Sequence, residues 1–133
     1  MLHRFSFKKK DRLSQQKIIQ KLFQEGIQIN FYPFKIYMLQ VEKSLSQRIQ
    51  VLVSVPKKQF KKAADRNLVK RRIREAYRLN KQILNEIKLK PEMQIAIAFV
   101  YNTDKIHDHG LIQDKMTEAL NKIITVIEKN MAI

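Results

Sequence analysis

The sequence predicts an α+β fold, an α/β sandwich whose elements follow in the order α-β-β-α-β-α. Three segments repeat apolar residues at the spacing of an amphipathic helix, and three others are rich in alternating, β-branched or aromatic residues. A further short strand near the N-terminus is left open. Because the chain has 133 residues and no repeat or Gly/Ser-rich linker, we expect one domain over residues 1–133.

The N-terminal half is predicted to hold one helix and two strands. The helix begins at Ser14, a residue type that caps helix N-termini, and ends at Glu25, with Gly26 in a left-handed conformation after it. The first strand is Phe34–Val41. The second strand, Arg48–Val55, places its β-branched residues on one face: Ile49, Val51, Val53 and Val55.

The C-terminal half is predicted to hold a long helix, a strand and a last helix. The long helix runs from about Lys62 to about Ile87, and the last helix is Leu111–Lys129. The strand Met93–Tyr101 is apolar on both faces, with the small Ala96 and Ala98 on one of them. We therefore expect this strand in the centre of the sheet, with its alanine face under a helix.

Positive charge is concentrated in two segments. The chain carries 27 Lys and Arg against 12 Asp and Glu, a net charge of +15. Residues 1–12 contribute +4, and residues 57–81 contribute +9, with Asp65 and Glu75 as their acids. This localisation predicts an anionic partner that binds a defined patch.

Several classes of protein are excluded by composition. The absence of Cys removes disulfides and Cys-containing zinc sites, and two glycines are too few for a nucleotide-binding Gly-rich loop. No apolar run approaches the length of a membrane span and no secretory signal is visible, so we expect a cytoplasmic protein without a membrane partner. The loop Asp104–His109 is interpreted as solvated, so no metal ligand is predicted, and no Ser, His and acid arrangement suggests a catalytic residue.

The long helix sorts its residues into an apolar arc and an adjacent cationic arc. The cationic arc holds Asn67, Lys70, Arg71, Arg74, Arg78 and Lys81. A solvated helix face is the alternative, but it would carry Glu residues four positions from the bases, and within residues 57–81 Glu75 is the one acid after Asp65. The crowded cations therefore favour a nucleic-acid interface.

The residues of this helix resemble a known signature. Asp65–Glu75, which reads DRNLVKRRIRE, resembles the Arg-Asn-x-x-Lys-Arg-x-x-Arg-Glu motif of the bacterial ribonuclease P protein component family. Val53–Lys58 is similar to the family's strand that ends in paired lysines, and Leu22–Gly26 to its opening pattern. The similarity covers about residues 4–100. Gln50–Val53 departs from it, because the family often has Gly in this strand.

The resemblance implies a fold detail and a function. The fold would contain a left-handed β-α-β crossover, against the usual right-handed rule. The chain would be the protein subunit of ribonuclease P and would bind the catalytic RNA and the 5′ leader of precursor tRNA. Endonucleolytic removal of the leader would be catalysed by that RNA with Mg²⁺, so the protein would belong to an endoribonuclease without an active site of its own. We expect a monomer without RNA.

The candidate binding residues form two sets. The helix face implied to contact the catalytic RNA consists of Arg66, Asn67, Lys70, Arg71, Arg74 and Arg78. For the leader, aromatic rings on strands would stack on unpaired bases, and nearby bases would contact phosphates. That set consists of Phe5, Phe7, Lys8, Arg12, Tyr37, Lys57 and Lys58. Core packing is the alternative for the aromatic rings, which also include Phe34, Phe99 and Tyr101.

Two rival functions share some of these features. A ribosomal or nucleoid-type binding protein without a catalytic role would have the same size and charge. A metal-dependent protein nuclease would need clustered carboxylates in a basic cleft, which the segment 57–81 does not offer.

Overall fold

The computed structural model describes residues 9–42, 45, 47–90 and 92–131. Its strands form one mixed sheet with the order β1-β2-β4-β3: β1 (Ile27–Phe31), β2 (Phe34–Glu42), β4 (Met93–Tyr101) and β3 (Ile49–Ser54). β2 pairs antiparallel with both β1 and β4, and β3 pairs parallel with β4. This confirms the predicted α+β class with a mixed sheet.

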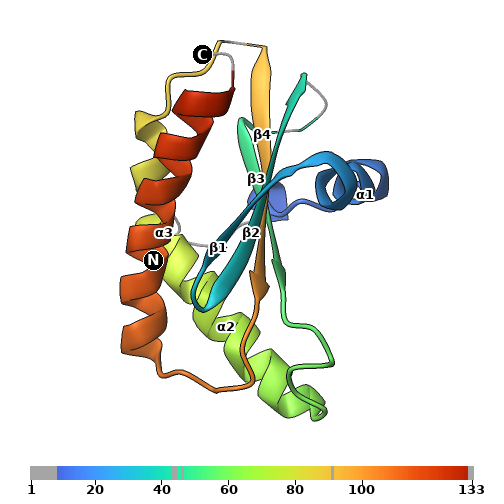
Figure 1. The fold of residues 1–133 in the computed structure, drawn as a ribbon, viewed down its shortest axis with the longest axis vertical. Helices are drawn as coiled ribbons and strands as arrows, with labels where there is room; N and C mark the ends of the chain where they lie inside the picture. Colours follow the sequence, from blue (N-terminus) through green and yellow to red (C-terminus); the bar gives the residue numbers. More distant parts are fainter. Residues whose placement is uncertain (1–8, 43–44, 46, 91, 132–133) are drawn as a thin grey trace.

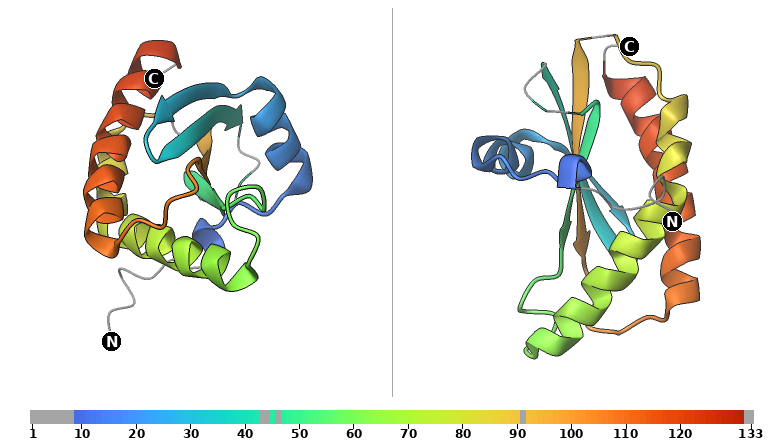
Figure 2. Two further views of the ribbon diagram at one scale, coloured as in Figure 1. Left: turned by 60° about the horizontal axis from the view of Figure 1, so that its bottom comes forward. Right: turned by 180° about the vertical axis from the view of Figure 1, so that it is seen from behind.

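Helices cover both faces of the sheet, which gives three layers (Figures 1 and 2). α1 (Gln16–Glu25) lies on one face, while α2 (Ala63–Asn80) and α3 (His109–Asn130) lie on the other. The larger core lies between the sheet and α2 and α3. The smaller core packs α1 through Ile18 and Leu22 against Ala96 and Ala98 of β4. β4 is therefore central, with its alanine face under a helix, as predicted.

Each of the three predicted helices has an end that differs from its prediction, and the strand and remaining helix ends agree to within one residue. α1 begins after Gln15 rather than at Ser14, and no side chain caps its N-terminus. Helical structure continues to Glu86, but Lys81–Glu86 is a 3-10 helix, η3, because the backbone changes at Asn80, where φ is −119°. α3 begins at His109 because Asp108 caps it by accepting a hydrogen bond from the Leu111 N–H at 2.9 Å.

Gly26 was predicted in a left-handed conformation, and this was wrong. Its φ is −66° and its ψ is 156°, which is extended backbone. Glycine is required here by close approach: a Cβ at this position would lie 2.4 Å from the Leu22 carbonyl oxygen and 2.9 Å from that of Met38. The chain therefore passes from α1 directly into β1 in contact with β2.

The additional strand that was left open is β1, between α1 and β2 rather than at the N-terminus itself. Of the residues before α1, the described ones (9–15) contribute a single parallel bridge, between Arg12 and Val51 on the edge of the sheet. β3 and β4 are joined through α2, which makes the parallel crossover. The left-handedness of this crossover stays a prediction from the resemblance.

Candidate RNA-binding surface

α2 presents one apolar side to the core and an opposite polar side to solvent. Its buried residues are Val69, Ile73, Ala76 and Tyr77, which recur every three or four positions. Tyr77 is 3% exposed, and its burial raises the pKa of the phenol. The predicted apolar arc is confirmed over this helix, and it fixes which side chains point outward.

The predicted cations on the outward side of α2 differ in exposure and in whether they form hydrogen bonds within the protein. Asn67, Arg71 and Arg74 are exposed, and Lys70 is half-buried. The Arg66 guanidinium donates to the carbonyls of Phe60 and Lys61 at 2.8 and 2.9 Å, so it holds the segment that leads into the helix.

Arg78 is engaged with an acid of the same helix. It forms a two-pronged ion pair with Glu75, and this hydrogen bonding lowers the pKa of the Glu75 carboxyl and raises that of Arg78. Arg66 and Arg78, at the two ends of this face, thus form hydrogen bonds within the protein. Arg71 and Arg74, between them, are the arginines directed to solvent.

Residues 9–13, before α1, are bound to the edge of the sheet and to Lys81 at the start of η3. The Leu13 N–H donates to the Val51 carbonyl at 3.0 Å, and the Gln50 amide donates to the Lys10 carbonyl at 2.7 Å. Asp11 forms an ion pair with Lys81 at 3.0 Å, and both side chains are less than a quarter exposed. The cations of this segment therefore lie beside α2 in a fixed position.

This arrangement creates a cationic pocket of about 290 Å³ beside β3. Three bases line it: Lys9 and Arg12 from the N-terminal segment, and Arg74 from α2. The other lining residues are Leu13, Ser14 and Val51–Val53, so no acid lines it among the described residues. The pocket joins a member of the predicted catalytic-RNA set, Arg74, to a member of the predicted leader set, Arg12.

The other predicted leader residues are placed only in part. Lys57 and Lys58 are exposed and follow the C-terminal end of β3. Tyr37 is half-buried on the sheet face that α1 covers, in one row with Ala98 and Leu52, and Leu52 lines the cationic pocket. Phe5, Phe7 and Lys8 lie outside the described residues.

The aromatic rings divide between core and surface. Phe34, Phe99 and Tyr101 are buried in the larger core, so the packing alternative is right for them. The sequence reasoning missed Phe23, which is 39% exposed and meets Tyr37 edge-to-face with ring centroids 4.7 Å apart. The sequence placed Phe23 in the apolar stripe of the first helix with Ile18, Ile19 and Leu22, which pointed to the core. Its exposure depends on how α1 is rotated on the sheet.

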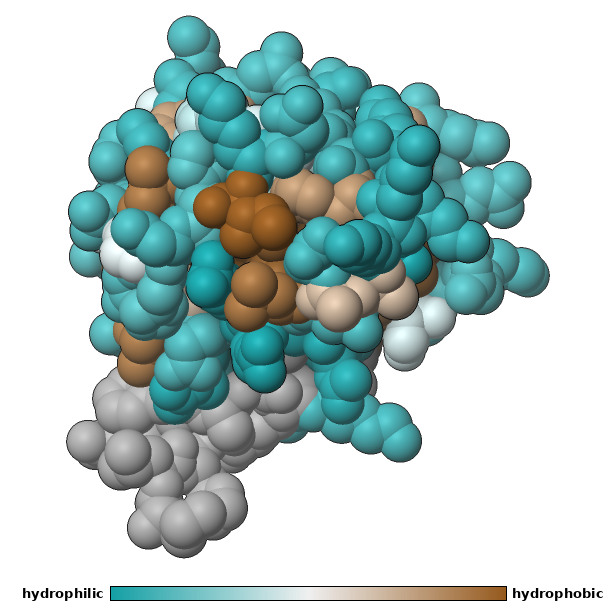
Figure 3. All heavy atoms as spheres, turned by 90° about the horizontal axis from the view of Figure 1, so that it is seen from below, coloured by the Kyte–Doolittle hydropathy of each residue, from teal (hydrophilic) through white to brown (hydrophobic). Residues whose placement is uncertain are grey.

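The loop before α3 is tied to the sheet and to α2. The Arg72 guanidinium donates to the His107 carbonyl at 2.7 Å, and the Tyr101 hydroxyl donates to the Lys105 carbonyl at 2.6 Å. Seen from below, most of this face is hydrophilic, and an apolar area lies near its middle (Figure 3). In the described part of the chain, no group of three or more His, Cys, Asp or Glu could hold a metal ion. None of the described helices is long and apolar enough to cross a membrane.

Comparison with known proteins identifies the family. The model of the Ribonuclease P family matches residues 7–124. The chain is 37% identical over 120 residues to a ribonuclease P protein component of Porphyromonas gingivalis, covering 90% of this chain and 87% of that protein. It is 30% identical over 132 residues to the one of Chlorobium phaeobacteroides, covering 92% and 90%.

The fold is also that of solved structures. The RNase P protein of Staphylococcus aureus superposes with a TM-score of 0.65 at 22% identity, covering 87% of this chain and 96% of that chain. The protein of Thermotoga maritima gives 0.63 at 22% identity, with 84% and 96% covered. Because the family model spans most of the chain and curated relatives align over most of their length, the chain belongs to the ribonuclease P protein component family, an RNA-binding family of tRNA processing.

Proposed function

We propose that this chain joins two RNA molecules in a ribonuclease P holoenzyme. The outward side of α2 binds the catalytic RNA, and the cationic pocket with the neighbouring Tyr37 and Phe23 binds the 5′ leader of precursor tRNA. The observation that carries this proposal is the shared pocket: Arg74 of α2 and Arg12 of the N-terminal segment line one cavity beside β3. A phosphate backbone bound there contacts both surfaces at once.

The contribution of the protein is electrostatic and positional. Arg71 and Arg74 offer planar guanidinium groups that suit bidentate contact with phosphates. Phe23 and Tyr37 offer ring surface on which an unpaired base stacks, worth about 1–3 kcal/mol per base. Where two RNA backbones approach each other, these cations lower their mutual repulsion and thereby raise the affinity for the substrate.

Hydrolysis in this proposal is carried out by the RNA, with Mg²⁺ as the group that activates water and stabilises charge on the phosphate. The donor set of the protein supports this division. Among the acids beside the proposed RNA surface, Asp11 is paired with Lys81 and Glu75 is paired with Arg78. These acids do not fit a protein-held magnesium site, so no step is assigned to protein ligands.

Reconstitution with the cognate catalytic RNA tests the proposal. At low Mg²⁺, addition of the protein is expected to accelerate removal of the leader, and the gain is expected to grow when the leader is long enough to reach the cationic pocket. A chain that binds precursor and mature tRNA equally well in the presence of the catalytic RNA would instead be a general basic RNA-binding protein. RNA cleavage by the purified protein alone would contradict the division of labour.

A further inference from the structure

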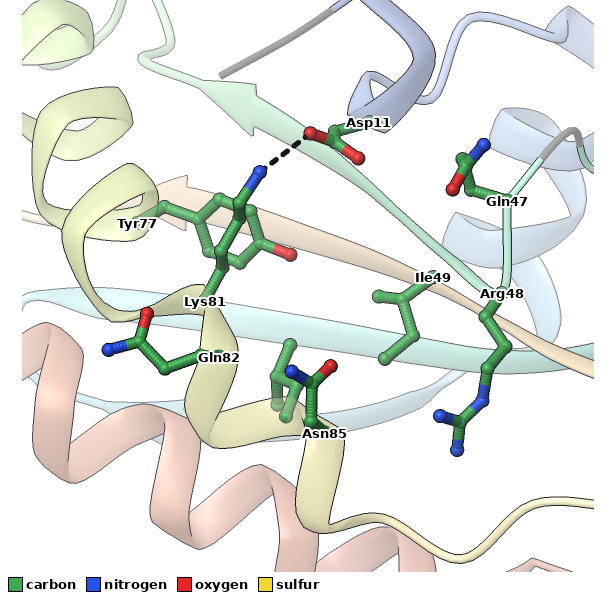
Figure 4. A pocket seen from close by; sticks show the side chains of 9 residues that line it. Asp11, Gln47, Arg48, Ile49, Tyr77, Lys81, Gln82 and Asn85 are labelled. Carbon is green, nitrogen blue, oxygen red and sulfur yellow. Dashed lines mark hydrogen bonds and ion pairs between the residues drawn. The ribbon is translucent and has the colours of Figure 1, made fainter. Parts of the chain in front are cut away.

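A second pocket, distinct from the cationic pocket, is lined by Asp11 of the N-terminal segment. It measures about 550 Å³, within the range of small-molecule sites, and lies between the start of β3 and the turn from α2 into η3 (Figure 4). Its lining residues are Asp11, Gln47, Arg48, Ile49, Tyr77, Lys81, Gln82, Leu84 and Asn85. The Asp11–Lys81 ion pair is part of its wall.

The pocket combines an apolar wall with polar groups that face inward. Ile49 lies opposite Tyr77 and Asn85, and both the Tyr77 hydroxyl and the Asn85 amide point into the space between these elements (Figure 4). The Arg48 guanidinium donates to the Ile87 carbonyl at 2.5 Å, which fixes a planar cation at the rim. A fixed guanidinium plane is a surface on which RNA-binding proteins stack unpaired bases.

The charges of this pocket distinguish it from a plain anion site. The cationic pocket beside it has three bases and no acid, which suits phosphates. Here two bases, Arg48 and Lys81, share the wall with the carboxylate of Asp11. A carboxylate repels a phosphate, but it accepts hydrogen bonds from the amino group of a base, as Asp and Glu do with cytosine N4.

Its location connects the pocket to the proposed RNA surface. Lys81 stands on the same arc as Lys70 and Arg74, about two turns after Arg74 and about three turns after Lys70 along the helical segment. An RNA strand that follows this arc reaches Lys81 at its end, where a phosphate meets the ammonium group and the adjoining base can turn into the pocket.

From these observations we propose that the pocket binds one unpaired nucleotide and prefers a base with an exocyclic amino group. Asp11 accepts from that amino group, Asn85 contacts the base edge, and Lys81 and Arg48 contact the phosphate and the base plane. The ligand chemistry is that of a nucleotide, supplied either by RNA or by a free nucleotide. The assignment to RNA rests on the function proposed above.

The test compares two ligands of equal size on the full chain. Cytidine and uridine 5′-monophosphate differ at position 4, where cytidine has an amino group and uridine a carbonyl. Titration of isotope-labelled protein followed by NMR is expected to show shifts at the pocket residues and about tenfold tighter binding of the cytidine nucleotide, the effect of one hydrogen bond to a charged group. Equal affinities, or equal shifts with inorganic phosphate, would overturn the proposal.

Two variants separate recognition from folding. Asp11→Asn is expected to reduce the preference to about twofold or less, because an amide presents both a donor and an acceptor. Asn85→Ala leaves the Asp11–Lys81 ion pair in place and is expected to weaken both nucleotides about fivefold or more. Asn121→Ala, at an exposed position of α3, is the matched control and should change neither. If Asn85→Ala behaves like this control, the pocket is not the site.

A final measurement identifies the source of the nucleotide. With the catalytic RNA bound, the shifts caused by the free cytidine nucleotide are expected to disappear, because an RNA nucleotide fills the pocket. Shifts that persist at unchanged affinity would assign the site to free nucleotides instead. Base-selective binding to the protein alone does not depend on leader cleavage. The failure of either proposal is therefore visible without the other.

Discussion

Removing the Arg74 guanidinium tests whether the two proposed RNA-binding surfaces meet. Arg74 is exposed on α2 and lines the cationic pocket together with Lys9 and Arg12. Each phosphate contact with a single strand contributes about 0.7 to the slope of log affinity against log salt concentration. For an interface of about six contacts, the slope is about −4 to −5, and Arg74→Ala is expected to make it shallower by about 0.7 to 0.9.

The expected change in salt dependence is small, and this determines how binding must be measured. Between 50 and 200 mM salt, six contacts at 0.7 each weaken binding by about 2.5 orders of magnitude and five contacts by about 2.1. The two proteins thus differ by only about 2.5-fold in their response, so equilibrium binding must be measured at several salt concentrations across this range. The ligands are the catalytic RNA and, in its presence, precursor tRNA with long and short leaders.

Lys122→Ala is the matched control because it removes one exposed cation from α3 and changes the net charge equally. It is expected to leave the salt slope unchanged. If Arg74→Ala also leaves it unchanged for both ligands, the cationic pocket is not part of the interface. If the slope changes for the catalytic RNA and not for the leader, the shared-pocket argument is wrong and the two surfaces are separate.

Three further predictions concern the framework of the site. Tyr77→Ala is expected to lower the free energy of unfolding by about 3–5 kcal/mol, since the ring is buried in the larger core, and a denaturant titration that shows a loss below about 1 kcal/mol would contradict this. Gly26→Ala is expected to lower the free energy of unfolding by about 1–3 kcal/mol, because the new Cβ would meet two backbone oxygens. At Gly110 a Cβ would meet only the Asp108 carboxylate, at 3.6 Å, so Gly110→Ala should be neutral or stabilising. A lower melting temperature for Gly110→Ala than for Gly26→Ala would refute the close-approach argument. Because pairing with Arg78 lowers the pKa of Glu75 in the folded state, its contribution to stability is present above the unfolded pKa and is lost as the pH falls through the folded pKa. Glu75→Gln should therefore flatten the acid side of the stability profile, and an unchanged profile would show that the ion pair contributes nothing in solution.

Periodicity predicted the elements that carry the site. The alternation of Met93–Tyr101 and the two arcs of the segment after Lys62 depend on local spacing, and packing on both sides of the sheet preserves them. The signature residues Arg66–Glu75 therefore occur on one helix with the expected outward side. The strand β1 was left open and was not given a range, although Ile27, Ile29 and Phe31 alternate, because it follows α1 without an intervening turn.

Tertiary contacts explain what the sequence could not predict. The cationic pocket brings together Arg12, which precedes α1, and Arg74 of α2, which are far apart in the sequence. The exposure of Phe23 depends on the rotation of α1, and the break at Asn80 depends on packing around η3. Spacing within a single segment contains no information about such long-range contacts.

The fastening of the N-terminal segment to β3 also protects the edge of the sheet. A free edge strand offers unpaired backbone groups to a second molecule, and natural proteins block such edges with cover or charge. Here the Val51 carbonyl already accepts the Leu13 N–H, and Lys9, Arg12 and Arg48 flank the same strand. A second copy that tried to add its own β3 would have to displace this segment and bring like charges together. The residues proposed to bind RNA thus also cover the edge at which a second chain would add its strand.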